Sequence, residues 1–218
     1  MNLKHYFLRR HVLLGAGALG FYIARTAPAN AASVGDINQT PGLIDVKGHL
    51  PNLSFQMERT SDGQSVSAAN YQGDVVIVYF GFTRCTDTCP LTVMNAARLI
   101  SSLDTVANRV RFLFVTVDLN YDTPERLKRY LAQFGPPPYI DGLYGTPTTL
   151  DFFAKRFGVF FKAPRSPNAP DPQAGIRHSD AVFLFNPAGQ AVAIINDFGD
   201  GNPHLRSLSA LVKELLTG

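Results

Sequence analysis

Two cysteines separated by three residues are the part of this sequence best suited to chemistry. Cys85 and Cys89 are the only cysteines in the chain, and a disulfide between them would close too small a loop to stabilise the fold much. At this spacing the two sulfurs can converge on one ion or oxidise together. Thiolate sulfur is a soft ligand that suits Cu(I) or Zn(II). The pair therefore predicts either a metal site or a redox site.

A metal held by only two thiolates is held poorly, so a metal site here requires a third ligand from elsewhere in the chain. Beyond residue 31 the sequence contains three histidines: His49, His178 and His204. His178 stands just before an apolar run, 181–185, which we expect to lie next to the strand that leads to the cysteines. We therefore predict His178 as the third ligand, and expect the other two imidazoles at the solvated surface.

The cysteines lie between a short apolar run and a helical pattern. Val75–Phe80 is an unbroken run of β-branched and aromatic residues, which predicts a buried central strand. Pro90 suits the first turn of a helix, and Pro90–Leu103 has helical apolar spacing. Open α/β sheets bind ligands where such a strand ends. The dipole of the following helix is expected to favour thiolate over thiol there.

The rest of the sequence predicts an alternating order of strands and helices. The expected elements are a hairpin around Ser61-Asp62-Gly63, a strand Val110–Val117, a helix capped by Asp122 or Thr123, a strand Tyr139–Leu143, a helix from Thr146, an extended stretch Val159–Lys162, a hairpin of Ala181–Phe185 with Ala191–Ile195, and a last helix from Pro203. Ala163–Gly175 carries four prolines and is expected to be an irregular surface excursion. This order predicts an α/β, thioredoxin-like fold with an N-terminal β-hairpin and an extra strand–helix insertion.

The first 31 residues have the features of an export signal. Basic residues precede the apolar run His11–Ala24, which is too short to span a bilayer comfortably, and Ala29–Ala31 fits a small-residue cleavage site. The pair Arg9-Arg10 resembles a twin-arginine signal. We expect a secretory signal peptide, with an uncleaved membrane anchor as the alternative. The expected location is therefore the periplasm or another extracytoplasmic compartment, which permits disulfides.

Charge and length fit one exported domain. Four of the 20 basic residues and none of the 17 acidic residues lie in 1–31, so the remainder has a net charge of −1. This balance gives no reason to expect nucleic acid as a partner. We expect 32–50 to be a flexible leader and 51–218 to be a single domain.

Four stretches resemble the Sco/SenC family of copper-binding assembly proteins. Gly81–Pro90 resembles the family's C-x-x-x-C-P signature, and Val117–Lys128 resembles its V-D-P-x-R-D-T-P-E-x-L-K. Gly142–Pro147 is similar to its G-L-T-G-T loop, and His178-Ser179 to the H-S before a hydrophobic strand. The resemblance runs from about Pro51 to the C-terminus in the order that the family has.

The resemblance implies a thioredoxin-like protein that binds one copper, as Cu(I), Cu(II) or both, through Cys85, Cys89 and His178. It further implies delivery of copper to the copper-bearing subunit of cytochrome c oxidase, or maintenance of that site's cysteines, and a role as assembly factor and not enzyme. Another copper chaperone is an alternative partner. Thr86 and Leu119 stand where the family usually has Pro, Tyr121 where it has Arg, and Tyr144 where it has Thr. None of these replacements removes a ligand.

Two neighbours are expected to tune the site. Asp118, at the end of the second central strand, is a candidate acceptor for a hydrogen bond from His178. Arg84 is expected to lower the pKa of the thiols.

The rival function is that of an extracytoplasmic thiol–disulfide oxidoreductase acting on partner cysteines. Its usual motif has two residues between the cysteines, and this chain has three. Thioredoxin-like redox enzymes have a cis-proline in the loop beside the two cysteines, just before a strand. Pro147 is interpreted as a first-turn helix proline and does not fill that position. The loop that precedes the expected strand 181–185 carries His178 instead. The sequence thus favours a metal site, although the same pair of cysteines could also be redox-active.

Overall fold

The computed structural model describes residues 37–162 and 177–217, and for Arg177 and His178 it describes the backbone alone. These residues belong to one compact unit, Ala32–Gly218. The predicted signal (1–31) and the Pro-rich stretch 163–175 lie outside the described residues. Within the described ranges, no helix has the length and hydropathy needed to cross a membrane.

The strands alternate with helices much as the sequence predicts. The strands are β1 (Leu43–Asp45), β2 (Gln56–Arg59), β3 (Gln64–Ser67), β4 (Val75–Gly81), β5 (Val110–Thr116), β6 (Ile140–Tyr144), β7 (Phe161–Lys162), β8 (Arg177–His178), β9 (Val182–Phe185) and β10 (Ala191–Ile195). The helices are α1 (Thr88–Ser101), α2 (Pro124–Leu131), α3 (Pro147–Arg156) and α4 (Leu205–Thr217), with 3-10 turns η1 (Ile37–Gln39), η2 (Ala68–Tyr71) and η3 (Asp104–Arg109).

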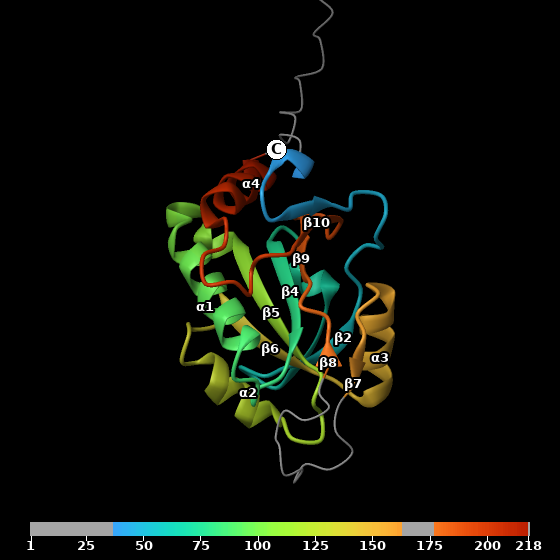
Figure 1. Cartoon of the computed structure of the whole chain (residues 1–218). Coiled ribbons are helices and arrows are strands. Elements are labelled where there is room, and N and C mark those ends of the chain that lie inside the picture. The colour runs from blue at the N-terminus through green and yellow to red at the C-terminus, as the bar shows by residue number, and fades with distance from the viewer. Residues whose placement is uncertain (1–36, 163–176, 218) are drawn as a thin grey trace, which may run out of the picture. The chain divides into compact units, whose positions relative to one another are not determined.

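One sheet, in the order β1-β10-β9-β4-β5-β6-β2-β3, organises the unit. β4, β5 and β6 are parallel, and β9 runs antiparallel to β4 on its other side. Figure 1 shows α1 and α4 to one side of β4 and α3 to the other, as parallel strands joined by helices require. The prediction of a thioredoxin-like α/β fold with an added hairpin, β2–β3, is confirmed.

β4 is the centre of the core because all seven of its residues are buried. Its side chains alternate between the two faces of the sheet. The hydroxyl of Tyr79 reaches Cys89 on α1, whereas the ring of Phe80 packs 5.2 Å from that of Phe153 on α3. The sheet is therefore covered on both faces at the strand that leads to the cysteines.

The helix after the cysteines begins earlier than predicted. α1 starts at Thr88 and not at Pro90, with Asp87 as its N-cap residue. Pro90 then occupies the third helical position, where its missing N–H is still one of those without an intrahelical acceptor. As a result Cys89 lies inside the first turn and not on the loop before it.

The predicted flexible leader, 32–50, is wrong for the part of it that the structure describes. Leu43–Asp45 forms β1, which pairs antiparallel with β10 at the edge of the sheet. Ile37, Leu43 and Val46 are buried in the main core. This stretch is short, and polar residues separate its apolar ones, so its local sequence does not indicate a strand. β1 forms because it pairs with β10.

Gly81 ends β4 at a position with no room for a side chain. A Cβ there would lie 2.7 Å from Cζ of Phe114 and 2.8 Å from Cε1 of Tyr79. We predict that Gly81→Ala lowers the free energy of unfolding by about 1–3 kcal/mol, because either ring must leave its packed position. Gly201→Ala is the control, since a Cβ at Gly201 meets nothing within 4 Å. Urea unfolding would measure both, and equal stabilities for the two variants would contradict this account.

Candidate metal centre

The candidate site lies beyond the carboxyl ends of β4 and β5. Gly81 pairs with Thr116 at the end of the two strands, and the chain after each strand continues at this edge of the sheet. Cys85 is on the loop between β4 and α1, and Cys89 is in the first turn of α1. The sequence-based placement of both cysteines at this edge is confirmed.

The two cysteines contact each other. The backbone N–H of Cys89 donates to Sγ of Cys85 over 3.4 Å, and a hydrogen bond with the Cys85 thiol contributes to the raised pKa of Cys89. Both are present as thiols. Cys85 is partly exposed, whereas Cys89 is fully buried. The pair therefore has an inner and an outer sulfur.

Burial opposes the effect that the helix dipole is expected to have on the Cys89 thiol. Burial, followed by the contact with Cys85, raises the pKa of the Cys89 thiol far above its ordinary value. The partial charge of the helix N-terminus is worth at most about 2 kcal/mol, and desolvation of a fully buried thiolate outweighs it. Cys89 is thus protonated at neutral pH unless a cation replaces its proton.

The backbone of His178 runs beside this edge of the sheet. It forms β8, where His178 pairs with Phe161, and the N–H of Ser179 donates to the carbonyl of Phe160 over 3.1 Å. Four residues later Val182 pairs with Tyr79 on β4. His178 was predicted just ahead of this strand, and its side chain lies outside what the structure describes. Its assignment as a ligand therefore stays a prediction.

Asp118 is buried and pairs with Arg84. Nε of Arg84 donates to Oδ2 of Asp118 over 2.7 Å, and the two side chains are 7% and 0% exposed. The guanidinium also stacks on the ring of Tyr121, 4.6 Å from its centroid. The charge of Arg84 is therefore engaged by a carboxylate, and its expected lowering of the pKa of the thiols stays a prediction. This pair ties the loop of Cys85 to the chain after β5.

The other oxygen of Asp118 is available to a further donor. Oδ1 is buried and has no hydrogen-bond partner among the residues that the structure describes. An acceptor of this kind suits the N–H of a metal-bound imidazole. The predicted bond from His178 to Asp118 is compatible with this arrangement and is untested by it.

Asp122 holds the same loop from a second direction. Its Oδ2 accepts from the backbone N–H of Thr83 over 3.1 Å, and its carboxylate also accepts from the hydroxyls of Thr83 and Thr116. The cap of α2 is Thr123 and not Asp122. Sequence reasoning missed this role, because the Asp-Thr-Pro-Glu pattern offers two equally good capping residues.

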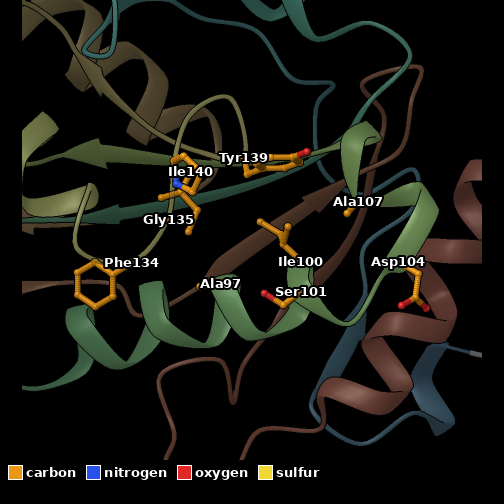
Figure 2. Close-up of a pocket in the computed structure, with 10 residues that line it drawn as sticks. Ala97, Ile100, Ser101, Asp104, Ala107, Phe134, Gly135, Tyr139 and Ile140 are labelled. Carbon is orange, nitrogen blue, oxygen red and sulfur yellow. The ribbon is translucent and has the colours of Figure 1, made fainter.

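The cavity of Figure 2 is separate from the cysteines. Its volume is about 310 Å³, and Figure 2 shows Phe134, Tyr139 and Ile140 facing Ala97 and Ile100 of α1. Neither cysteine lines it. This cavity is therefore not part of the candidate metal centre.

A third ligand is needed to complete a metal site. Among the side chains that the structure describes, no three of His, Cys, Asp and Glu form a metal-binding group. The side chain of His178 is outside that set. The donor chemistry that is described, two contacting thiols without a carboxylate ligand, fits a soft monovalent ion better than a hard divalent one.

Comparison with known proteins identifies the family. The family model described as SCO1/SenC matches residues 52–213. The chain belongs to the SCO1/SenC family.

Individual members of the SCO1/SenC family match most of this chain. It is 29% identical over 182 residues to Protein SCO2, mitochondrial, of Saccharomyces cerevisiae, covering 83% of this chain but only 58% of that protein's length. It is 25% identical over 179 residues to a SCO2-like protein of Rickettsia conorii, covering 82% of each. The crystal structure of yeast Sco1 with copper bound superposes with a TM-score of 0.63 and 30% identity over 75% of this chain and 90% of that one.

The buried ion pair gives a first prediction for this site. Asp118→Asn leaves the charge of Arg84 without its carboxylate in a buried position, so we expect a loss of about 3–5 kcal/mol in the free energy of unfolding. The double variant Arg84→Met with Asp118→Leu removes both charges and should cost clearly less. Urea unfolding would measure both, and a double variant less stable than the single one would contradict a charge-based explanation.

Asp122 gives a second prediction, on pH. Burial, opposed in part by the Thr116 and Thr83 hydrogen bonds, raises the pKa of Asp122. The folded protein therefore keeps a proton that the unfolded chain loses near pH 4, and this contribution to stability is complete below that pH and declines as pH rises through the raised pKa. Asp122→Asn removes the titratable carboxyl group, and with it this dependence of stability on pH.

We expect the stability of the wild type to fall relative to Asp122→Asn as pH rises from about 4, by at most about 1.4 kcal/mol per pH unit. Chemical denaturation at a series of pH values would measure the difference. A difference that is constant with pH, or that grows in the opposite direction, would show that the pKa of Asp122 is not raised.

Proposed function

We propose that this protein is a metallochaperone that binds one copper ion and delivers it to cytochrome c oxidase, or maintains the cysteines of that oxidase's copper site. The observation that carries the proposal is the contact between Cys85 and Cys89 beyond the carboxyl end of β4. Membership of the SCO1/SenC family and the copper bound by a relative with the same fold support it.

The proposed ligands are the sulfurs of Cys85 and Cys89 and the imidazole of His178. Two thiolates and one imidazole form a nearly trigonal donor set, which Cu(I) accepts readily, whereas Cu(II) takes a further donor or a tetragonal arrangement. Copper replaces both thiol protons, which leave to solvent. The buried Oδ1 of Asp118 would accept the remaining imidazole N–H of His178.

The unequal exposure of the two sulfurs suggests an order of transfer. Cys85 is partly exposed and Cys89 is fully buried. An incoming thiolate of a partner, either the copper-bearing oxidase subunit or another copper chaperone, can reach copper from the side of Cys85. It displaces that sulfur first, and Cys89 is the last protein thiolate to leave.

The alternative function is thiol–disulfide exchange with partner cysteines. The contact of the two thiols is compatible with their oxidation. The usual motif of such oxidoreductases has two residues between its cysteines, and this chain has three. We therefore place redox activity second to copper binding.

We further propose that the protein works outside the cytoplasm, in the periplasm of its cell. The basic and apolar composition of residues 1–31 supports export. The same segment would hold the protein at the membrane only if it is not cleaved. Copper transfer to a membrane-bound oxidase would take place at that membrane's outer surface.

Copper titration of the reduced protein tests the proposed ligands. We expect one tight equivalent of Cu(I) in the wild type, its loss in Cys85→Ser and Cys89→Ser, and a larger effect of His178→Ala on Cu(II) than on Cu(I). His204→Ala is the matched control, because its ring bonds to Asp197 and it is not among the proposed ligands.

Stoichiometry and affinity would be measured against a chromophoric Cu(I) chelator. If the variant with both cysteines replaced by serine still bound one Cu(I) with similar affinity, the ligand assignment would be wrong. Rapid cycling of the two cysteines with glutathione, without tight copper binding, would instead favour the oxidoreductase function.

A further inference from the structure

Tyr79 places a hydroxyl against the buried cysteine. Its Oη donates to Sγ of Cys89 over 3.4 Å. Tyr79 and Cys89 are both fully buried, so water does not compete for this bond. Tyr79 interrupts an otherwise apolar strand, and a buried phenol in such a strand needs a polar partner. The sulfur of Cys89 is such a partner.

The packing of β4 fixes this hydroxyl in place. Strand alternation directs Tyr79 toward α1, and its ring meets that of Phe114 edge-on, 5.7 Å between centroids. The ordinary pKa of a tyrosine hydroxyl is about 10, well above physiological pH. Tyr79 therefore keeps its proton and remains a hydrogen-bond donor across the physiological pH range.

Each of the two sulfurs thus accepts a hydrogen bond from a donor fixed by the fold. Cys85 accepts from the backbone N–H of Cys89, and Cys89 accepts from Tyr79. A hydrogen bond to a charged acceptor is roughly twice as strong as one to a neutral acceptor. Both hydrogen bonds therefore strengthen when a metal replaces the thiol protons. The bond from Tyr79 does so at the sulfur of Cys89, whose charged form is the more costly of the two to desolvate.

We propose that Tyr79 is a positioning residue of the copper site, whose hydroxyl orients the sulfur of Cys89 toward Cys85 and stabilises it as a thiolate ligand. This inference rests on the proposed function. When copper binds, Cys89 loses its proton to solvent and Tyr79 retains its own. Tyr79 does not coordinate the ion, because its oxygen donates its proton to the sulfur.

The structure supplies a matched control in Tyr130. Its ring packs edge-on against the same Phe114 at 5.8 Å. Its Oη is buried but has no hydrogen-bond partner among the described residues. Tyr79→Phe and Tyr130→Phe therefore each remove one buried hydroxyl from one aromatic cluster, and only the first removes a bond to sulfur.

The test compares these two variants in the full chain with the wild type. We expect Tyr79→Phe to bind Cu(I) about tenfold more weakly, because a bond to a charged sulfur is lost. We expect its thiolate-to-Cu(II) charge-transfer band to move to longer wavelength, since the sulfur lone pair is no longer stabilised. Tyr130→Phe should leave both affinity and band unchanged. A purely structural role of Tyr79 would not move the band.

Unchanged affinity and band in Tyr79→Phe would overturn the inference, as would the same shift in both variants.

Failure of the wild type to bind copper would overturn the proposed function instead, and the inference would then be decided by the apo-protein. Its equilibrium with glutathione disulfide converts both thiols to one disulfide and yields two glutathione thiols. Tyr79→Phe should shift this equilibrium severalfold toward the disulfide, because reduced Cys89 loses its donor, and no shift would overturn the inference.

Discussion

The burial of β4 on both faces is the constraint on which the candidate site depends. All seven residues of the strand are buried, with α1 and α4 to one side and α3 to the other (Figure 1). If the cysteines lay within this strand, both of them would be buried. It ends at Gly81, where no side chain fits, and Cys85 emerges at the edge while Cys89 is held under it. The difference in exposure between the two sulfurs follows from this geometry.

Burial and charge oppose each other at this edge. The helix N-terminus favours a thiolate, but the desolvation of Cys89 is the larger effect and keeps that thiol protonated. The cation that replaces the proton must therefore bind sulfur strongly, which favours a thiophilic ion over a hard one. Around the thiols, Oδ2 of Asp118 bonds to Arg84, and the carboxylate of Asp122 bonds to Thr83 and Thr116. These bonds hold the loop that carries Cys85 in place, and metal coordination is left to softer donors such as the thiols.

Much of the fold could be predicted from the sequence because its signals are local. The run Val75–Phe80, the Ser61-Asp62-Gly63 turn and the Thr-Pro helix starts at Thr123 and Thr146 each specify their own structure. The early start of α1 could not be predicted in the same way, because proline is tolerated at more than one position of a first turn. β1 depends on pairing with β10, which local sequence does not encode.

The site was predictable in its residue types and less so in its interactions. The spacing of Cys85 and Cys89 indicated a shared site, and the structure brings the two thiols into contact. The pairing of Arg84 with Asp118 joins residues 34 positions apart, and the bond from Tyr79 to Cys89 requires the relative placement of a strand and a helix. Both are tertiary contacts between residues whose individual types suggest other roles.

The central claim is that Cys85, Cys89 and His178 together hold one copper ion. X-ray absorption at the copper edge, on the full chain loaded with one equivalent of Cu(I), tests it most directly because it counts the neighbouring atoms by element. The account predicts two sulfur neighbours and one nitrogen neighbour that belongs to an imidazole. Three or more sulfur neighbours, or a shell of nitrogen and oxygen alone, would contradict the claim.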